Sequence, residues 1–427
     1  MGNTVLRTIL PACLLLAPLG AEGQVAVSPA TTSAPAIDAA AFANCRSRLR
    51  VQAEAAGIAG AGFDRHLTGV APDASVLALL DAQPEFSTPI WDYLAALVDE
   101  ERVADGRAML KAHAGTLARA ERTYGVDAAT IVAVWGVESD YGKTFGKRPL
   151  LQSLATLSCF GRRQDFFRGE LFATLALLQS GDLRAEGLTG SWAGAFGHTQ
   201  FMPTTYRRLA VDFDGDGRRD LVNSITDALG STANYLKRAG WRTGEPWGFE
   251  VRLPAGFSTS LAGRRNKRAL SEWATRGVTR VDGSALVAGS LGGATQAGVL
   301  LPAGSGGPAF VVLRNFDAIY SYNAAESYAL AIAHLSDRLR GGGRFVTPWP
   351  TDDSGIGRGE RRELQTLLLA RGHAIGEVDG MIGTLTRRAI VIEQQRLGLA
   401  PADGRAGRKV LEALRSDARA TQPARTR

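Results

Sequence analysis

The chain has 427 residues, of which 45% are hydrophobic and 21% are charged. This length predicts two or three domains, and the composition is that of a soluble globular protein with a sizeable core. The net charge of +7 favours an anionic partner such as nucleic acid, anionic lipid or a cell-wall polymer. No basic and aromatic nucleic-acid motif is present, which argues against nucleic acid.

The first 23 residues resemble a secretory signal peptide, with one Arg, an apolar stretch and then small residues. Cleavage is expected after Ala21 or Gly23. The stretch is too short to span a bilayer stably, and no later run has the length and apolarity of a transmembrane helix. Cys13 lies in "LPAC", which resembles a lipobox, but the apolar run continues beyond it. We therefore predict export to the periplasm, with a lipid anchor on Cys13 as the less favoured alternative.

The remaining chain alternates between helical and extended patterns. Residues 24–38 are rich in Ala, Ser, Thr and Pro and predict a flexible leader. Apolar residues recur at helical spacing from about 42 to 183 and again at 226–239. Short apolar runs separated by Gly and Pro predict a β insertion at about 249–316. After one more helix, a Gly- and Pro-rich linker is expected at 341–353.

One glutamate follows an almost wholly apolar run, "AATIVAVWGV". Asp127 can cap a helix starting at Ala128, and a helix that is apolar all round is a buried helix. Glu138 would lie near its C-terminal end, where burial and the helix dipole both disfavour the ionised carboxylate. A carboxyl that stays protonated is what a general acid needs. The alternative is a glutamate that simply emerges at the surface.

A second carboxylate that could complete a glycosidase pair is not evident. Asp140 is two residues further along, and residues at that spacing on a helix do not face each other. The sequence therefore does not predict a paired-carboxylate hydrolase. A single acid suffices if the substrate supplies its own nucleophile.

Two further stretches have candidate binding residues. "SWAGAFGHTQFMPTTY" at 191–206 combines glycines with polar and apolar groups, as sugar sites do, although a turn before a core helix has the same composition. "DFDGDGRRD" places Asp212, Asp214 and Asp216 ahead of a glycine, like the start of an EF-hand loop. Asn223 stands where an EF-hand has its closing Glu, so the alternative is a solvated acidic turn.

The segment 354–414 contains a quasi-repeat in which "DGMIG" and "DGRAG" each precede an amphipathic helix. It resembles the small three-helix peptidoglycan-binding domain attached to many wall-lytic enzymes. The alternative is an unspecific helical cap. The tail at 415–427 is expected to be disordered.

"VWGVESDYG", the 191–206 block, the acidic loop and "DALGSTANYL" occur in this order along the chain. Together they resemble the membrane-bound lytic murein transglycosylase B family, over about residues 42–340. The resemblance implies a lysozyme-like helical catalytic domain at 39–340. It also implies cleavage of the β-1,4 bond between N-acetylmuramic acid and N-acetylglucosamine, without water, to give 1,6-anhydro-N-acetylmuramic acid ends.

The resemblance also implies roles for individual residues. Glu138 would be the only catalytic acid/base. The implied substrate-binding residues are Ser191, Gln200, Tyr206, Tyr235, Tyr322, Asn323 and Tyr328. Asn323 would hold Glu138 or the reacting sugar. The family often has Arg where this chain has Ser321, so that contact stays open.

No cofactor is expected for catalysis, but the resemblance implies a structural calcium ion. Its ligands would be Asp212, Asp214, Asp216, the carbonyl of Arg218 and Asp227. Asp220 is a reserve candidate for the same ion.

Two cysteines remain after signal cleavage, Cys45 and Cys159. An even pair in an exported protein favours a disulfide, here between the first predicted helix and the catalytic domain. Buried reduced thiols are the alternative.

Other functions fit the sequence less well. A zinc amidase needs clustered ligands, but the five histidines are scattered. A cysteine peptidase using Cys159 has no identifiable His partner. A lysozyme-like hydrolase and a non-catalytic wall-binding protein stay open as alternatives. The expected partner is the peptidoglycan glycan strand, with no nucleic acid and no transmembrane segment.

Overall fold

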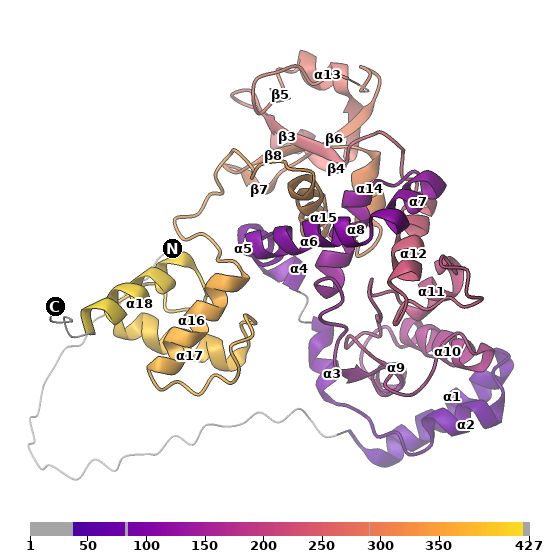
Figure 1. Cartoon of the computed structure of the whole chain (residues 1–427). Coiled ribbons are helices and arrows are strands. Elements are labelled where there is room, and N and C mark those ends of the chain that lie inside the picture. The colour runs from indigo at the N-terminus through magenta and orange to yellow at the C-terminus, as the bar shows by residue number, and fades with distance from the viewer. Residues whose placement is uncertain (1–36, 82–83, 290, 422–427) are drawn as a thin grey trace, which may run out of the picture. The chain divides into compact units, whose positions relative to one another are not determined.

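The computed structural model describes residues 37–81, 84–289 and 291–421 (Figure 1). The predicted signal peptide, with Cys13, lies outside these residues. Within the described ranges no helix is long and apolar enough to cross a membrane. The predicted fold class is confirmed: the described chain is mainly helical, with a small β insertion and a helical C-terminal module.

One lobe of the helical domain packs around the buried side chains of Phe63, Leu154 and Phe167. A short antiparallel sheet, β1 (Arg148–Pro149) with β2 (Thr189–Gly190), borders it. The helices of this lobe are α1 (Ala39–Ala55), α2 (Gly60–Leu67), α3 (Ser75–Ala78), α9 (Leu150–Cys159), α10 (Gln164–Ser180) and α11 (Pro203–Leu209). The one-turn segments η1 (Leu79–Asp81) and α4 (Pro84–Ser87) lead to the next lobe.

The second lobe surrounds α8 (Ala128–Ser139), whose run of apolar residues is buried against its neighbours, as its sequence predicts. Trp135 of α8 and Leu330 belong to the same core. The neighbouring helices are α5 (Ile90–Leu97), α6 (Glu100–Ala112), α7 (Ala114–Tyr124), α12 (Ile225–Arg238), α14 (Arg314–Tyr320) and α15 (Glu326–Leu339).

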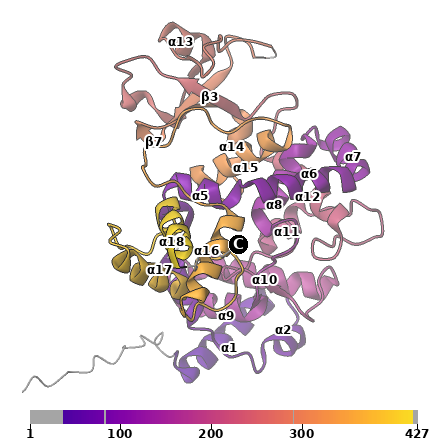
Figure 2. The same ribbon diagram turned by 60° about the vertical axis from the view of Figure 1, so that its left-hand side comes forward.

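The β insertion forms an antiparallel sheet in the strand order β4-β6-β8-β3-β5. Trp273 of α13 (Leu270–Thr275) packs on the sheet, and its indole donates to the Ala297 carbonyl. The sheet lies beyond α14 and α15, at the opposite end of the domain from α1 and α2 (Figures 1 and 2). The strands are β3 (Gly248–Arg252), β4 (Gly263–Ala269), β5 (Thr279–Arg280), β6 (Gln296–Leu300), β7 (Pro302–Ser305) and β8 (Ala309–Val312), with η2 (Thr259–Leu261) between β3 and β4.

The C-terminal module consists of α16 (Arg358–Ala370), α17 (Thr384–Arg396) and α18 (Arg408–Thr421) around its own apolar core. The prediction of a disordered tail from residue 415 is wrong for 415–421, because α18 continues through these residues. Asp417 secures them by pairing with Arg371 at 2.7 Å and with Arg396 at 2.6 Å.

Candidate active site

Glu138 lies in the last turn of α8. Asp127 caps the start of this helix by accepting a hydrogen bond of 3.0 Å from the Thr130 amide. The residues from Ile131 to Gly136 are buried, and the helix ends at Asp140, whose φ of 51° is left-handed. The catalytic candidate is therefore fixed at the end of a buried helix rather than on a mobile surface.

Burial is the main influence on the Glu138 carboxyl, and it raises the pKa of Glu138 to about 8. The Tyr328 hydroxyl, from α15, donates a hydrogen bond to Oε1 of Glu138 and works in the opposite direction. The negative charge of Glu85 raises the pKa further. Glu138 is thus protonated at neutral pH and can donate a proton.

Two residues near Glu138 were not identified from the sequence: Glu85 on α4 and Tyr93 on α5. Burial, followed by the charges of Glu85 and Glu138, raises the pKa of Tyr93 well above its usual range. Glu85 is tied to the start of α15, because the Ser327 hydroxyl donates to its carbonyl at 2.6 Å. The amide of Asn323 lies 3.5 Å from its carboxylate. The spacing of acids along the sequence gives no signal for Glu85, because another helix supplies its carboxylate.

Three of the predicted substrate-binding tyrosines form one cluster beside Glu138. The Tyr235 and Tyr322 ring centroids are 4.5 Å apart, and those of Tyr322 and Tyr328 are 6.4 Å apart. The Tyr322 hydroxyl donates to the Thr199 carbonyl at 2.8 Å, and the Tyr235 hydroxyl donates to the Ser321 carbonyl at 2.7 Å. The cluster thus joins α12, α15 and the 191–206 loop.

The 191–206 loop is attached directly to the end of α8. The Ser139 hydroxyl donates to the His198 carbonyl at 2.5 Å, and the Trp135 indole donates to Nδ1 of His198 at 3.2 Å. The Ser191 hydroxyl accepts from the Ala195 amide at 3.0 Å, which shapes the turn. Gly197 has φ of 77°, and a Cβ there would lie 2.6 Å from the Leu221 carbonyl oxygen, so only glycine fits.

Gln200 also lies in this loop, with φ of 49°, and its side-chain amide donates to the Gly197 carbonyl at 2.8 Å. The prediction that Tyr206 binds substrate is wrong. Tyr206 is 0% exposed and its ring stacks on Phe196, because it lies on the inward face of α11. Asn323 is exposed near the site, where its side-chain amide lies 3.5 Å from the Glu85 carboxylate.

A family model for the transglycosylase SLT domain matches residues 41–337 of the chain. The chain belongs to this family. A second model, for a putative peptidoglycan binding domain, matches residues 357–414. The ordered motifs of the sequence therefore predicted the family correctly, and the chain is a lytic transglycosylase that cleaves peptidoglycan.

Three relatives illustrate the similarity. The membrane-bound lytic murein transglycosylase B of Escherichia coli (strain K12) is 35% identical over 299 residues, which are 65% of this chain and 79% of that protein. The structure of SltB3 from Pseudomonas aeruginosa, in complex with NAG-anhNAM-pentapeptide, is 50% identical with a TM-score of 0.70 and covers 88% of this chain and 99% of that one. The Escherichia coli lytic transglycosylase Slt35, in complex with calcium, is 32% identical with a TM-score of 0.61 and covers 69% of this chain and 92% of that one.

The acidic loop of the transglycosylase brings together Asp212, Asp214 and Asp227, each with a carboxylate oxygen within 4.8 Å of the others. Asp227, in the first turn of α12, is buried and accepts from the Phe213 and Asp220 amides at 2.6 and 2.8 Å. Burial raises the pKa of this carboxyl. Among the residues that the structure describes, Asp216 and Asp220 do not belong to this group of three carboxylates. Asp220 instead accepts from the Val222 and Asn223 amides.

Cys45 and Cys159 form a disulfide with their Cα atoms 5.8 Å apart. The bond ties α1 to the end of α9. It fastens the first helix of the transglycosylase to the lobe that carries the 191–206 loop.

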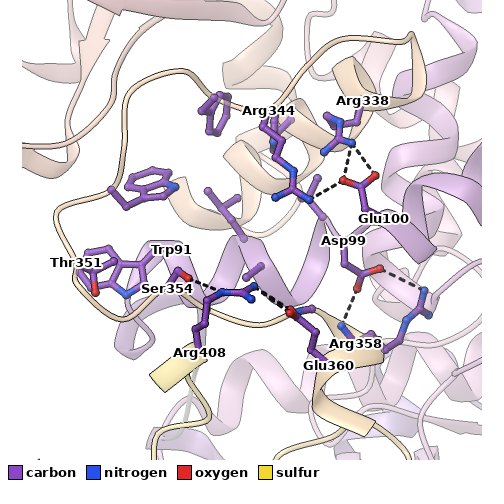
Figure 3. Close-up of a pocket in the computed structure, with 18 of the residues that line it drawn as sticks. Trp91, Asp99, Glu100, Arg338, Arg344, Thr351, Ser354, Arg358, Glu360 and Arg408 are labelled. Atoms are coloured by element: carbon purple, nitrogen blue, oxygen red, sulfur yellow. Dashed lines mark hydrogen bonds and ion pairs between the residues drawn. The ribbon is translucent and has the colours of Figure 1, made fainter. Parts of the chain in front are cut away.

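A pocket of about 740 Å³ lies beside α5 and the start of α16, and Glu138 is not among its lining residues (Figure 3). The pocket includes Trp91 and several ion pairs. Glu100 accepts from Arg338 at 2.9 Å and from Arg344 at 2.7 Å (Figure 3). This pocket is therefore distinct from the active site.

Proposed function

We propose that Glu138 is the single acid/base of the transglycosylase. Its carboxyl donates a proton to the bridging oxygen, the bond from C1 of N-acetylmuramic acid to that oxygen breaks, and N-acetylglucosamine leaves with a free hydroxyl. The resulting carboxylate takes the proton from the C6 hydroxyl of the muramic acid as that oxygen bonds to C1. Glu138 ends protonated again, and no water is consumed.

The raised pKa of Glu138 is the observation that carries this proposal, because the first step needs the protonated carboxyl at neutral pH. The hydrogen bond from Tyr328 supports the second step, since it stabilises the carboxylate formed in between. Tyr328 therefore helps Glu138 to change from acid to base, and its own hydroxyl keeps its proton throughout.

The substrate groove is formed by Ser191, Gln200 and the tyrosine cluster, with Asn323 at its edge. The partly exposed rings of Tyr235 and Tyr322 supply apolar surface for sugar faces, and the side-chain amides of Gln200 and Asn323 supply hydrogen bonds. Ser321 cannot offer the charged group that the family often has at this position. We further propose that residues 39–340 form the domain that cleaves the glycan and that residues 354–414 form the domain that binds the wall.

A structural calcium ion is the second part of the proposal. Asp212, Asp214 and Asp227 supply the hard oxygen ligands that calcium prefers, and the carbonyl of Arg218 would add another. Such an ion would neutralise the repulsion among the carboxylates. It would also fix the acidic loop to α12, the helix that carries Tyr235.

The enzyme is proposed to act in the periplasm after removal of residues 1–23. This location is where its substrate lies, and it is compatible with the disulfide between Cys45 and Cys159. Fractionation of cells should place the processed protein in the periplasm, whereas unprocessed protein in the cytoplasm would contradict the proposal.

The proposal is tested by Glu138→Gln, with Glu121→Gln on the exposed face of α7 as a matched control. Loss of a general acid/base costs about 10²–10⁴-fold in rate. Clearing of purified sacculi should therefore fall by at least about 100-fold for Glu138→Gln and stay unchanged for Glu121→Gln. A Glu138→Gln enzyme with wild-type activity would refute the assignment.

A further inference from the structure

The first residue of α16, Arg358, connects the C-terminal module to the catalytic domain. Its side chain is only 13% exposed. Nη1 of its guanidinium donates to Asp140, and Nη2 lies 3.5 Å from Asp105 and 3.8 Å from Asp99. Glu101 lies 3.6 Å from its Nε. Figure 3 shows Arg358 facing Asp99 from the opposite side of the interface.

Asp140 is the critical partner because it ends α8, two residues after Glu138. Its amide donates to the Gly136 carbonyl at 3.1 Å, so it belongs to the last turn. Its other cationic partners are more distant: Arg102 at 3.5 Å and Lys143 at 3.8 Å. Without Arg358 this carboxylate, whose side chain is 13% exposed, would lose its closest guanidinium contact and keep only the longer ones to Arg102 and Lys143.

The rest of the interface places the module against the helices that frame the active site. Arg405 pairs with Asp92 of α5 at 2.6 Å, one residue before Tyr93. Gly355 approaches α5 so closely that a Cβ there would lie 2.9 Å from Cα of Asp92. The module therefore contacts α5, α6 and the end of α8 through its first turn and through Arg405.

From this geometry we propose that Arg358 is a positioning residue for Glu138. By holding Asp140 it fixes the last turn of α8, so the wall-binding module is part of the catalytic unit and not only a tether. This inference rests on the proposed role of Glu138. It implies that cutting the chain after residue 340 removes both wall binding and the support of the active site.

The test compares full-length Arg358→Met, Arg358→Lys and wild type on short, soluble, uncross-linked glycans. Such substrates reach the active site without tethering to a wall. We expect Arg358→Met to lower kcat about tenfold with KM within about twofold, since small displacements of a catalytic group have effects of this order or larger. Arg358→Lys should recover part of the loss, because it restores the cation.

Arg415→Met is the matched control, because Arg415 of α18 pairs with Glu363 inside the module at 2.6 Å. It should keep wild-type kcat, and Arg358→Met should still pellet with sacculi like wild type. A wild-type kcat for Arg358→Met, or an equal loss in Arg415→Met, would overturn the inference. So would a change in KM alone.

Asp140→Asn gives an independent variant if Arg358→Met fails to fold. Asp140→Asn should reproduce the loss of kcat. The double variant, Arg358→Met with Asp140→Asn, should have a kcat no lower than that of the less active single variant. A wild-type kcat for Asp140→Asn would overturn the inference. Failure of the proposed function is distinguishable, because Glu138→Gln would then keep wild-type kcat on the same glycans, or wild type itself would produce reducing ends instead of anhydro ends.

Discussion

Replacement of Tyr328 by Phe removes the hydrogen bond to Glu138 and leaves the ring in place. A hydrogen bond to a charged group contributes about 1.5–3 kcal/mol, and about 1.36 kcal/mol corresponds to one pKa unit. Because the bond favours the carboxylate, its loss should raise the pKa of Glu138 by about one to two units. The starting value is about 8, so the variant should titrate at about 9 or above.

The assay is the pH dependence of kcat/KM, which reports groups of the free enzyme. Protonated Glu138 is the active form for the first step, so the alkaline limb of the profile should move upward in Tyr328→Phe. The rate at the optimum should fall about tenfold, because the intermediate carboxylate loses its stabilising donor. Tyr328→Phe should therefore be less active than wild type at neutral pH, but its activity should decline only at a higher pH than that of wild type.

Tyr322→Phe is the control for this experiment. It also removes one hydroxyl from the tyrosine cluster, but that hydroxyl donates to the Thr199 carbonyl. Its alkaline limb should stay where it is in wild type. An alkaline limb that is unmoved or lower in Tyr328→Phe would refute the interpretation of the hydrogen bond.

Three further changes have defined outcomes. Glu85→Gln removes a like charge near Glu138, so the alkaline limb should move downward in the same assay; an upward shift would be inconsistent with that charge. Calcium at 100 times its Kd should stabilise the chelator-stripped protein by about 2.7 kcal/mol, and Asp214→Asn should abolish the gain; calorimetry without a heat of binding would exclude the site. Replacing Cys45 and Cys159 by Ser opens a loop with a sequence separation of 114 residues and should lower the free energy of unfolding in urea by up to about 5 kcal/mol. An unchanged urea midpoint would argue against a stabilising disulfide.

The features that the sequence predicted are those encoded by neighbouring residues. The apolar run before Glu138 and the cap at Asp127 specify α8 locally, and the ordered motifs identify the family. Glu85 and Tyr93 were missed because they reach Glu138 from α4 and α5, through packing that no local pattern encodes.

Two other predictions were wrong because tertiary contacts, and not the local sequence, decide the outcome. Tyr206 was assigned to the groove, but a tyrosine beside glycines and apolar residues fits a core equally well, and here it stacks on Phe196. The composition of the end of α18 predicts disorder, whereas Asp417 pairs with Arg371, just after α16, and with Arg396 of α17. Long-range ion pairs of this kind, including those of Arg358, are set by the tertiary fold.

The central claim is that Glu138 works with the C6 hydroxyl of the substrate and not with water. Digestion of purified sacculi in ¹⁸O-labelled water, followed by mass spectrometry of the muropeptides, tests it most directly. The account predicts 1,6-anhydro-N-acetylmuramic acid ends without ¹⁸O, and no products from Glu138→Gln. Reducing ends that carry one ¹⁸O atom would show that water is the nucleophile and would contradict the account.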